Sequence, residues 1–293
     1  MLSKLFNSPM SLLMLAVLFW AGNFVMGRAV RDDIPPITLA FYRWFFATLI
    51  AFFLARKHII KDLPQFKKNW LIVLLLSFTG IACFNTLVYI GLQSTVAVNA
   101  LLLQSVMPVL IIFFSFILFR EQIRTGQVFG ILMSMVGVIF IVAQGDIEIL
   151  SNLDMNRGDI LVFTAIILYA IYSVFLRKRP KVHPMSFLAV TFFTGTILLL
   201  PLYLYEAQVK PLNVTYISCA VFAYVAIFPS ILSYLCFNRG VELIGANRAG
   251  AFIHLMPVFG SIMAILFLGE KIHWFHGVGI LFIAVGIKTA TKK

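Results

Sequence analysis

Charged residues are scarce in this chain, and acidic residues are the scarcest. Only 12% of the 293 residues are charged, with 11 Asp and Glu against 23 Lys and Arg, whereas roughly a quarter of an ordinary soluble domain is charged. Hydrophobic residues make up 61%, more than one water-soluble core can bury. The shortage of charge therefore excludes an ordinary soluble domain and predicts that lipid surrounds most of the chain.

Residue patterns that support metal, phosphate or covalent chemistry are also missing. The three cysteines, Cys83, Cys219 and Cys236, lie in apolar runs, so we expect small core residues rather than a disulfide framework or a metal cluster. No glycine-rich phosphate loop, zinc-ligand spacing or nucleophile motif is present. The sequence thus predicts no enzyme, no bound metal and no cofactor.

Apolar runs of membrane-spanning length recur from end to end. A helix rising about 1.5 Å per residue needs about 20 residues to cross a hydrocarbon layer of about 30 Å. The first run is long and lacks a small-residue cleavage site, so it predicts a retained helix rather than a signal peptide. The predicted spans are 10–30, 37–55, 70–91, 97–119, 126–143, 159–177, 185–204, 215–237, 246–268 and 274–290.

The net charge of +12 comes from basic residues in short connectors rather than from a nucleic-acid-binding patch. With the N-terminus placed in the cytoplasm, the connectors on that side hold seventeen Lys and Arg, and those on the other side hold five. Cytoplasmic loops retain an excess of basic residues, and an odd number of helices would scramble this alternation. The pattern predicts an inner (plasma) membrane protein with both termini cytoplasmic and no nucleic-acid partner.

An internal repeat emerges when the chain is shifted by 149 residues without gaps. The shift superposes Met-Pro-Val at 107–109 on Met-Pro-Val at 256–258, and Glu121 on Glu270. Each half holds five predicted helices, so the second half starts on the opposite side of the membrane. We therefore predict an all-α polytopic membrane protein with ten transmembrane helices in two inverted five-helix repeats, residues 1–145 and 146–293, a design typical of secondary transporters.

Several motifs resemble one family. They are Phe-Trp-Ala-Gly-Asn-Phe at 19–24, Ile-Pro-Pro at 34–36 leading to Arg43, and a block used twice, in which Met-Pro-Val precedes an apolar stretch, a Glu and a glycine-bearing final helix. Together they resemble the EamA family of the drug/metabolite transporter superfamily over nearly the whole chain. The resemblance implies two EamA repeats, no prosthetic cofactor, and movement of small metabolites, often the export of amino acids or related compounds. Ala21 departs from the glycine that many relatives carry after the tryptophan.

Two ionisable side chains lie at predicted membrane depth, where charge is costly and marks functional candidates. Arg43 either attracts a substrate carboxylate or is a structural arginine bonded to backbone carbonyls or helix ends. His254, three residues before Pro257, either binds a polar substrate or a proton near neutral pH, or is a neutral imidazole hydrogen-bonded between helices.

No carboxylate is predicted at the membrane midplane. Asp159, Glu121, Glu242 and Glu270 all lie at the ends of spans. A proton-driven exchanger normally uses a titratable carboxylate at mid-depth, so its absence favours a facilitator, a substrate exchanger or a histidine-dependent mechanism. We expect Glu121 and Glu270 to cap connectors or to pair across them rather than to touch substrate.

Polar and aromatic residues at helical spacing indicate a shared cavity. Trp20 and Asn23 lie on one helix face, as do Asn85 and Tyr89. Matched positions of inverted repeats converge on the pseudo-symmetry axis, although such residues also join helices or anchor them at interfaces. The predicted substrate-binding residues are Trp20, Asn23, Arg43, Asn85, Tyr89, Gln104, Tyr172, Tyr234 and His254. Pro108 and Pro257, equivalent under the shift, are predicted gating hinges or static kinks.

These observations predict a secondary transporter that moves a small metabolite by alternating access. Its partners are the small-molecule substrate and membrane lipids, and we expect a monomer or a weak homodimer. The alternatives are an intramembrane lipid-modifying enzyme and a membrane accessory protein. An enzyme needs a nucleophile, base or metal set held together, and only one of the five histidines lies at depth.

Overall fold

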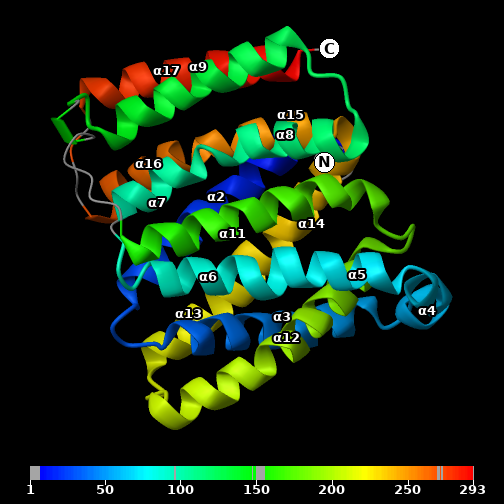
Figure 1. Ribbon diagram of the computed structural model, residues 1–293. Coiled ribbons are helices and arrows are strands. Elements are labelled where there is room, and N and C mark those ends of the chain that lie inside the picture. The colour runs from blue at the N-terminus through cyan, green and yellow to red at the C-terminus, as the bar shows by residue number, and fades with distance from the viewer. Residues whose placement is uncertain are drawn as a thin grey trace.

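The computed structural model describes residues 7–95, 97–146, 148–149, 156–268, 271 and 273–292, and these residues form helices and connectors without a strand (Figure 1). Nine helical segments among them are long and apolar enough to cross a membrane. Their elements are α2 (Pro9–Ala29), α3 (Pro36–Ala55), α5 (Trp70–Leu76) with the π-helix η1 (Ser77–Cys83) and α6 (Phe84–Gly91), α7 (Ala97–Gln104) with α8 (Met107–Phe119), α9 (Thr125–Val142), α11 (Arg157–Phe175) with the 3-10 helix η2 (Leu176–Lys178), α12 (Pro184–Val209), α13 (Tyr216–Ala226) with the π-helix η3 (Ile227–Leu232) and α14 (Ser233–Ile244), and α17 (Trp274–Thr291).

The predicted span 246–268 is not one of these nine. Its residues form α15 (Ala246–Gly250), the 3-10 helix η4 (Ala251–Leu255) and α16 (Met256–Leu268) in direct succession. The all-α polytopic class is confirmed, whereas the count of ten crossings stays a prediction.

Two connectors differ from the sequence-based expectation. Helices α12 and α14 run several residues past their predicted ends, because apolar and aromatic residues continue in helical register beyond them. The segment 56–69, expected as a plain connector, contains the helix α4 (Ile59–Lys68). The prediction that all three cysteines are core residues is wrong for Cys219, which is exposed on α13.

The helix starts follow local capping chemistry. The Asn156 side chain accepts hydrogen bonds from the backbone of Gly158 and Asp159, and the Asp159 carboxylate reaches back to the Asn156 N–H at 2.8 Å. Thr215 and Ser218 form the same arrangement, a capping box, at the start of α13: each side chain accepts a hydrogen bond from the backbone N–H of the other residue. Each box satisfies N–H groups that the first turn of a helix leaves without intrahelical partners.

Two spans loosen into π-helix at mid-length. The starts of η1 and η3 lie 150 residues apart and their ends 149, so the two segments nearly coincide under the sequence repeat. A π-helical turn displaces carbonyl groups from the regular ladder, and hydroxyls take some of them up: Ser230 Oγ donates to the Val225 carbonyl at 2.7 Å. The η3 break also leaves the Pro229 carbonyl available to other helices.

Helices α9 and α17 run side by side along one edge of the bundle (Figure 1). A Cβ at Gly130 would lie 2.4 Å from the Ala290 backbone nitrogen, and one at Gly137 would lie 2.6 Å from the Gly279 carbonyl oxygen. Glycine therefore lets the two backbones approach closely, as small residues do between membrane helices.

Both termini lie at the same end of the bundle, which is also the end that carries α4 (Figure 1). The connectors at this end hold the clusters of basic residues at 56–68 and 177–181. We call it the basic end.

Candidate functional site

Arg43 is fully buried at the centre of the bundle, on α3. Its Nη1 donates to Asn23 Oδ1, Asn85 Oδ1 and Tyr89 OH at 2.8–2.9 Å. Its Nε donates to Ser230 Oγ at 2.7 Å, and its Nη2 donates to the Pro229 carbonyl at 3.0 Å. One guanidinium thus joins α2, α3, α6 and η3 at a single point.

The acceptors around Arg43 are all neutral. None of the carboxylates in the described ranges forms an ion pair with it, and the guanidinium lies 4.6 Å from the centroid of the Trp44 ring. A buried cation without a counter-charge is costly, and neutral hydrogen bonds offset only part of that cost. The backbone-bonding alternative is realised in one bond, to Pro229, and attraction of a substrate carboxylate stays a prediction.

A small central cavity of about 10 Å³ lies beside this cluster. Four predicted residues line it: Trp20, Asn23, Asn85 and Gln104. Arg43 holds the side-chain oxygens of both asparagines, so the amide nitrogens point away from the guanidinium. Phe24, Phe84, Met107, Tyr169, Ile253 and Met256 complete the lining.

One polar atom of this lining, Gln104 Nε2, has no hydrogen-bond partner among the described residues, and its side chain is only 3% exposed. Buried polar atoms are nearly always paired in folded proteins, and an unpaired one costs about 1–3 kcal/mol. The lining therefore leaves one polar group available for hydrogen bonding.

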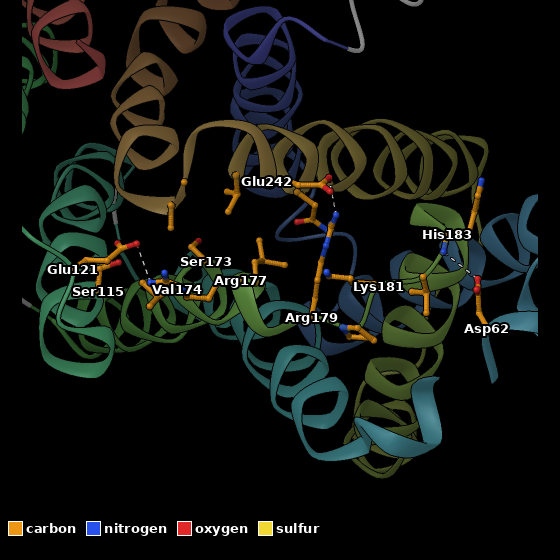
Figure 2. Close-up of a pocket in the computed structure, with 17 residues that line it drawn as sticks. Asp62, Ser115, Glu121, Ser173, Val174, Arg177, Arg179, Lys181, His183 and Glu242 are labelled. Carbon is orange, nitrogen blue, oxygen red and sulfur yellow. Dashed lines mark hydrogen bonds and ion pairs between the residues drawn. The ribbon is translucent and has the colours of Figure 1, made fainter. Parts of the chain in front are cut away.

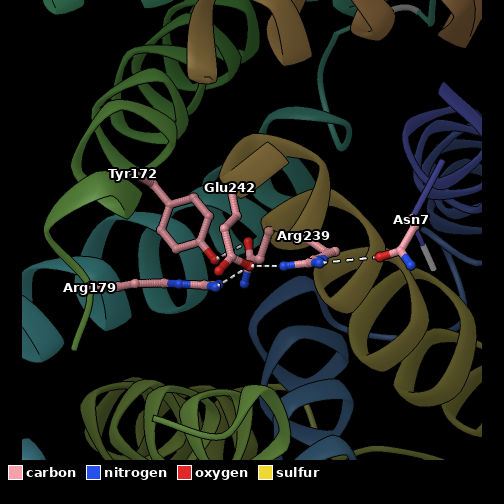
Figure 3. A network of polar contacts seen from close by, with 6 residues as sticks. Asn7, Tyr172, Arg179, Arg239 and Glu242 are labelled. Atoms are coloured by element: carbon pink, nitrogen blue, oxygen red, sulfur yellow. Dashed lines mark hydrogen bonds and ion pairs between the residues drawn. The ribbon is translucent and has the colours of Figure 1, made fainter. Parts of the chain in front are cut away.

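A larger cavity of about 680 Å³ opens at the basic end (Figure 2). We call it the vestibule. Arg177 pairs with Glu121 at 2.9 Å across it, and Glu242 bridges Arg179 and Arg239 at 2.9 Å each (Figure 3). Its lining combines basic and acidic side chains that are paired with one another rather than a single sign of charge.

An aromatic layer separates the vestibule from the central cavity. Tyr172 OH donates to Asn238 Oδ1 at 2.9 Å, and Asn238 lines the vestibule. The Tyr172 ring lies 5.8 Å from that of Tyr234, whose hydroxyl donates to the Gly80 carbonyl in η1. Tyr234 also accepts from Asn85 Nδ2 at 3.5 Å. The layer thus connects the two cavities through hydrogen bonds.

The opposite end carries its own polar cluster. Asp159 accepts hydrogen bonds from Thr95 and Asn99, and Arg28 donates to the carbonyls of Leu92 and Thr95 at 3.2 and 3.3 Å. A cavity of about 330 Å³ near this end shares no lining residue with the central cavity. These bonds tie α2, α6 and α11 together between the central cavity and that end.

His254 lies apart from the cavity lining. Its Nε2 bonds the Ser105 carbonyl at 2.8 Å and its Nδ1 bonds Ser134 Oγ, and the ring is 1% exposed. Because a carbonyl only accepts, Nε2 carries the proton and Nδ1 accepts. The geometry matches an imidazole bonded between helices, the second of the two interpretations of this residue.

Pro108 and Pro257 both occupy the second position of a helix, in α8 and α16. A proline there loses no helical hydrogen bond. The helix irregularity lies just before each proline, in the turn at 105–106 and in η4. Any hinge motion therefore belongs to these preceding residues. Glu270, the predicted partner position of Glu121, lies outside the described residues.

The 149-residue shift pairs Trp20 with Tyr169, so Tyr169 belongs to the helix faces that the sequence predicts to line the cavity. Sequence reasoning missed two other contributors to the site, Ser230 and the Pro229 carbonyl. Neither left a signal, since a serine and a proline in an apolar run predict neither a π-helix nor an acceptor for an arginine.

The fold and this site define a class: an all-helical, polytopic membrane protein with a polar centre. The model of the EamA-like transporter family matches residues 7–143 and again 156–290. The chain belongs to this family.

Relatives and a solved structure agree with this assignment. An uncharacterized transporter of Bacillus subtilis, YyaM, is 31% identical, with 78% of this chain and 75% of that protein aligned. An uncharacterized transporter of Archaeoglobus fulgidus is 26% identical over 96% of both chains. A protein of known crystal structure superposes with a TM-score of 0.78 over 96% of this chain and 95% of its own, at 16% identity, and supports the fold alone.

Proposed function

We propose that the protein is a secondary transporter that moves a small metabolite by alternating access around the central cavity. The observation that carries the proposal is the unpartnered amide nitrogen of Gln104, Nε2, in a cavity buried among spanning helices. Burying a polar group at membrane depth costs free energy, so polar groups found there often mark a substrate path.

The substrate is an amino acid or a related compound that carries a carboxylate. Gln104 offers an unpaired amide nitrogen beside the cavity, and Arg43 binds the side-chain oxygens of Asn23 and Asn85, which line it. Hydrogen-bond donors backed by an unneutralised cation favour an anionic acceptor group. The cavity of about 10 Å³ would have to widen to hold such a compound.

Export is the proposed direction, with both termini in the cytoplasm of a cell whose inner (plasma) membrane holds the protein. The vestibule opens at the basic end, and the excess of Lys and Arg on that side favours a cytoplasmic location. In this state a cytoplasmic solute reaches the aromatic layer of Tyr172 and Tyr234. The inverted halves, residues 1–145 and 146–293, would exchange conformations to open the other end.

Exchange assays in proteoliposomes test the proposal. Purified protein is first screened with amino acids and nucleosides by thermal shift, since a ligand of the folded state raises the unfolding midpoint. The best ligand is then loaded inside vesicles, and entry of its labelled form is measured. A transporter catalyses counterflow of unchanged solute, an enzyme returns an altered product, and an accessory protein does neither.

The variant Gln104→Leu removes one unpartnered donor and should reduce counterflow by about tenfold, the equivalent of about 1.4 kcal/mol. Gln93→Leu is the matched control, because Gln93 is exposed and its side chain reaches only the Arg31 carbonyl. Equal activity of the two variants would remove the central cavity from the mechanism.

A further inference from the structure

Helix α4 is a ten-residue helix at the basic end, between α3 and α5. Figure 1 shows it nearly end-on while the spanning helices run across the view, so its axis lies across theirs. A helix in this position lies along the membrane surface rather than through it. It contains Pro64 and is shorter than the 12–15 residues that an isolated helix needs in water, so its surroundings must stabilise it.

One face of α4 is held by the protein. Phe66 is 5% exposed against the core, and Asp62 Oδ2 accepts a hydrogen bond from the His183 N–H at 3.1 Å. Asp62 and His183 both line the vestibule. This face therefore fixes the helix to the rim of the vestibule.

Ile59 also packs partly against the core, but another face of α4 is exposed. Ile60 and Leu63 are 80% and 46% exposed, and the neighbouring ends of α3 and α5 expose Phe53, Leu54, Trp70 and Leu71 by 51–64%. The apolar surface of α4 thus continues the lipid-facing surface of the bundle. Insertion of this face into the boundary between headgroups and acyl chains would bury it.

Five exposed cations surround this apolar face. Within the parts of the chain that the structure describes, none of them forms an ion pair. Asp62 is the single acidic residue of the segment, and it is engaged with His183. The five are Arg56, Lys57, Lys61, Lys67 and Lys68.

We propose that α4 is an anionic-lipid binding element: its apolar face enters the leaflet at the basic end, and its cations bind the phosphate groups of anionic phospholipids there. The inference goes beyond topology, because an excess of positive charge alone sets orientation without requiring a helix, an apolar face or a contact with the vestibule rim. Through Asp62 and His183, bound lipid stabilises the rim at which solute enters.

The test compares lipid affinity and thermal stability of the full-length protein. Purified protein is placed in phosphatidylcholine nanodiscs or in nanodiscs that also contain phosphatidylglycerol, and intrinsic tryptophan fluorescence follows unfolding. Phosphatidylglycerol should raise the unfolding midpoint by several degrees. The triple variant K61Q/K67Q/K68Q should lose most of this rise and bind the lipid at least about tenfold more weakly.

A matched variant, K210Q/K271Q/K292Q, removes the same charge from positions outside α4 and should keep the rise. Raised salt should abolish the lipid effect in the wild type, since it screens surface charge. An equal lipid effect in both triple variants would overturn the proposal. Stabilisation by glycerol phosphate in phosphatidylcholine nanodiscs would also overturn it, because the site would then take free phosphate rather than a lipid.

Discussion

At the scale of single residues, Arg43 decides how the centre of the molecule is organised. Its planar fork satisfies five acceptors on several elements at once. These bonds organise the bundle, whereas attraction of a carboxylate to the neighbouring cavity by the unneutralised charge stays a prediction.

Arg43→Lys should therefore damage both stability and ligand binding. An ammonium keeps the charge but cannot reach Ser230, Pro229 and Asn85 together. We expect a lower unfolding midpoint and a ligand affinity weaker by about tenfold, or about 1.4 kcal/mol, measured by thermal shift with increasing ligand. Arg31→Lys, the same change at an exposed arginine paired with Asp32, is the control. A wild-type affinity in Arg43→Lys would contradict the role of the fork.

The depth of Arg43 in the membrane could be predicted because the sequence shows directly that this arginine lies within an apolar run. Its partners could be predicted only partly. Asn23, Asn85 and Tyr89 stand at helical spacing, whereas Ser230 and the Pro229 carbonyl depend on the π-helix η3. The same holds for His254: the sequence predicts its depth in the membrane but not its hydrogen bonds to Ser105 and Ser134.

At the scale of elements, the α9–α17 pair depends on glycine at the contact. A Cβ at Gly130 would meet backbone atoms of Gly286 and Ala290 at 2.4–2.5 Å, and backbone cannot yield as a flexible side chain can. Gly126, on the same helix, has only the Thr289 carbonyl oxygen, at 3.8 Å, near its Cβ position.

Gly130→Ala should consequently destabilise the protein by about 1–3 kcal/mol through overpacking. Gly126→Ala should be neutral or stabilising, by up to about 1 kcal/mol. Unfolding midpoints in one detergent measure both. If the two substitutions gave equal midpoints, close backbone packing would not be what holds these helices together.

The junction between α4 and α12 contains a second element-scale feature, a stacked pair of imidazoles. The rings of His58 and His183 lie 3.9 Å apart, and His183 Nδ1 accepts from the Met185 N–H at the start of α12. Partial burial lowers the pKa of His183 below its usual 6.5, the nearby His58 lowers it further, and the Asp62 carboxylate partly opposes this shift. A protonated Nδ1 would also lose its bond to Met185.

A lowered pKa in the folded state means that the junction is fully stabilised above pH 6.5 and loses stability as the pH falls below that value. The protection factors of the amide hydrogens in residues 56–69, which correct for slower intrinsic exchange in acid, should therefore fall on acidification. In His183→Asn, which keeps a side-chain acceptor for the helix start, the protection factors of this segment should depend much less on pH. The same acid response in both proteins would assign the effect to another group.

Most spans could be predicted at this scale because the length of an apolar run can be read directly from the sequence. The predicted span 70–91 coincides with the observed segment Trp70–Gly91. Helix α4 could not be predicted so simply, because an amphipathic surface helix with a proline resembles a charged connector in composition. The π-helical segments leave no mark in hydropathy.

At the scale of the whole molecule, several observations agree with two inverted halves. Residues 149 apart meet at the centre, as in the bonds of Asn85 with Tyr234 and of Ser105 with His254. The family model matches twice, and η1 and η3 nearly coincide under the 149-residue shift. Contacts between equivalent positions are expected near a pseudo-two-fold axis.

Inversion of the halves makes a prediction about topology. Single cysteines at positions 121 and 270, in a background without native cysteines, should react with a membrane-impermeant thiol reagent from opposite sides. Intact cells and inside-out vesicles provide the two sides. Reaction of both positions from the same side would contradict the inverted arrangement.

Alternating access to the central cavity is the central claim, and Phe24 offers its most direct test. Phe24 lines the cavity from α2 without belonging to the Arg43 cluster. In a background without native cysteines, Phe24→Cys should react with an impermeant thiol reagent applied from either side of the membrane, and saturating ligand should slow both reactions. Labelling from one side only, with and without ligand, would contradict transport through this site.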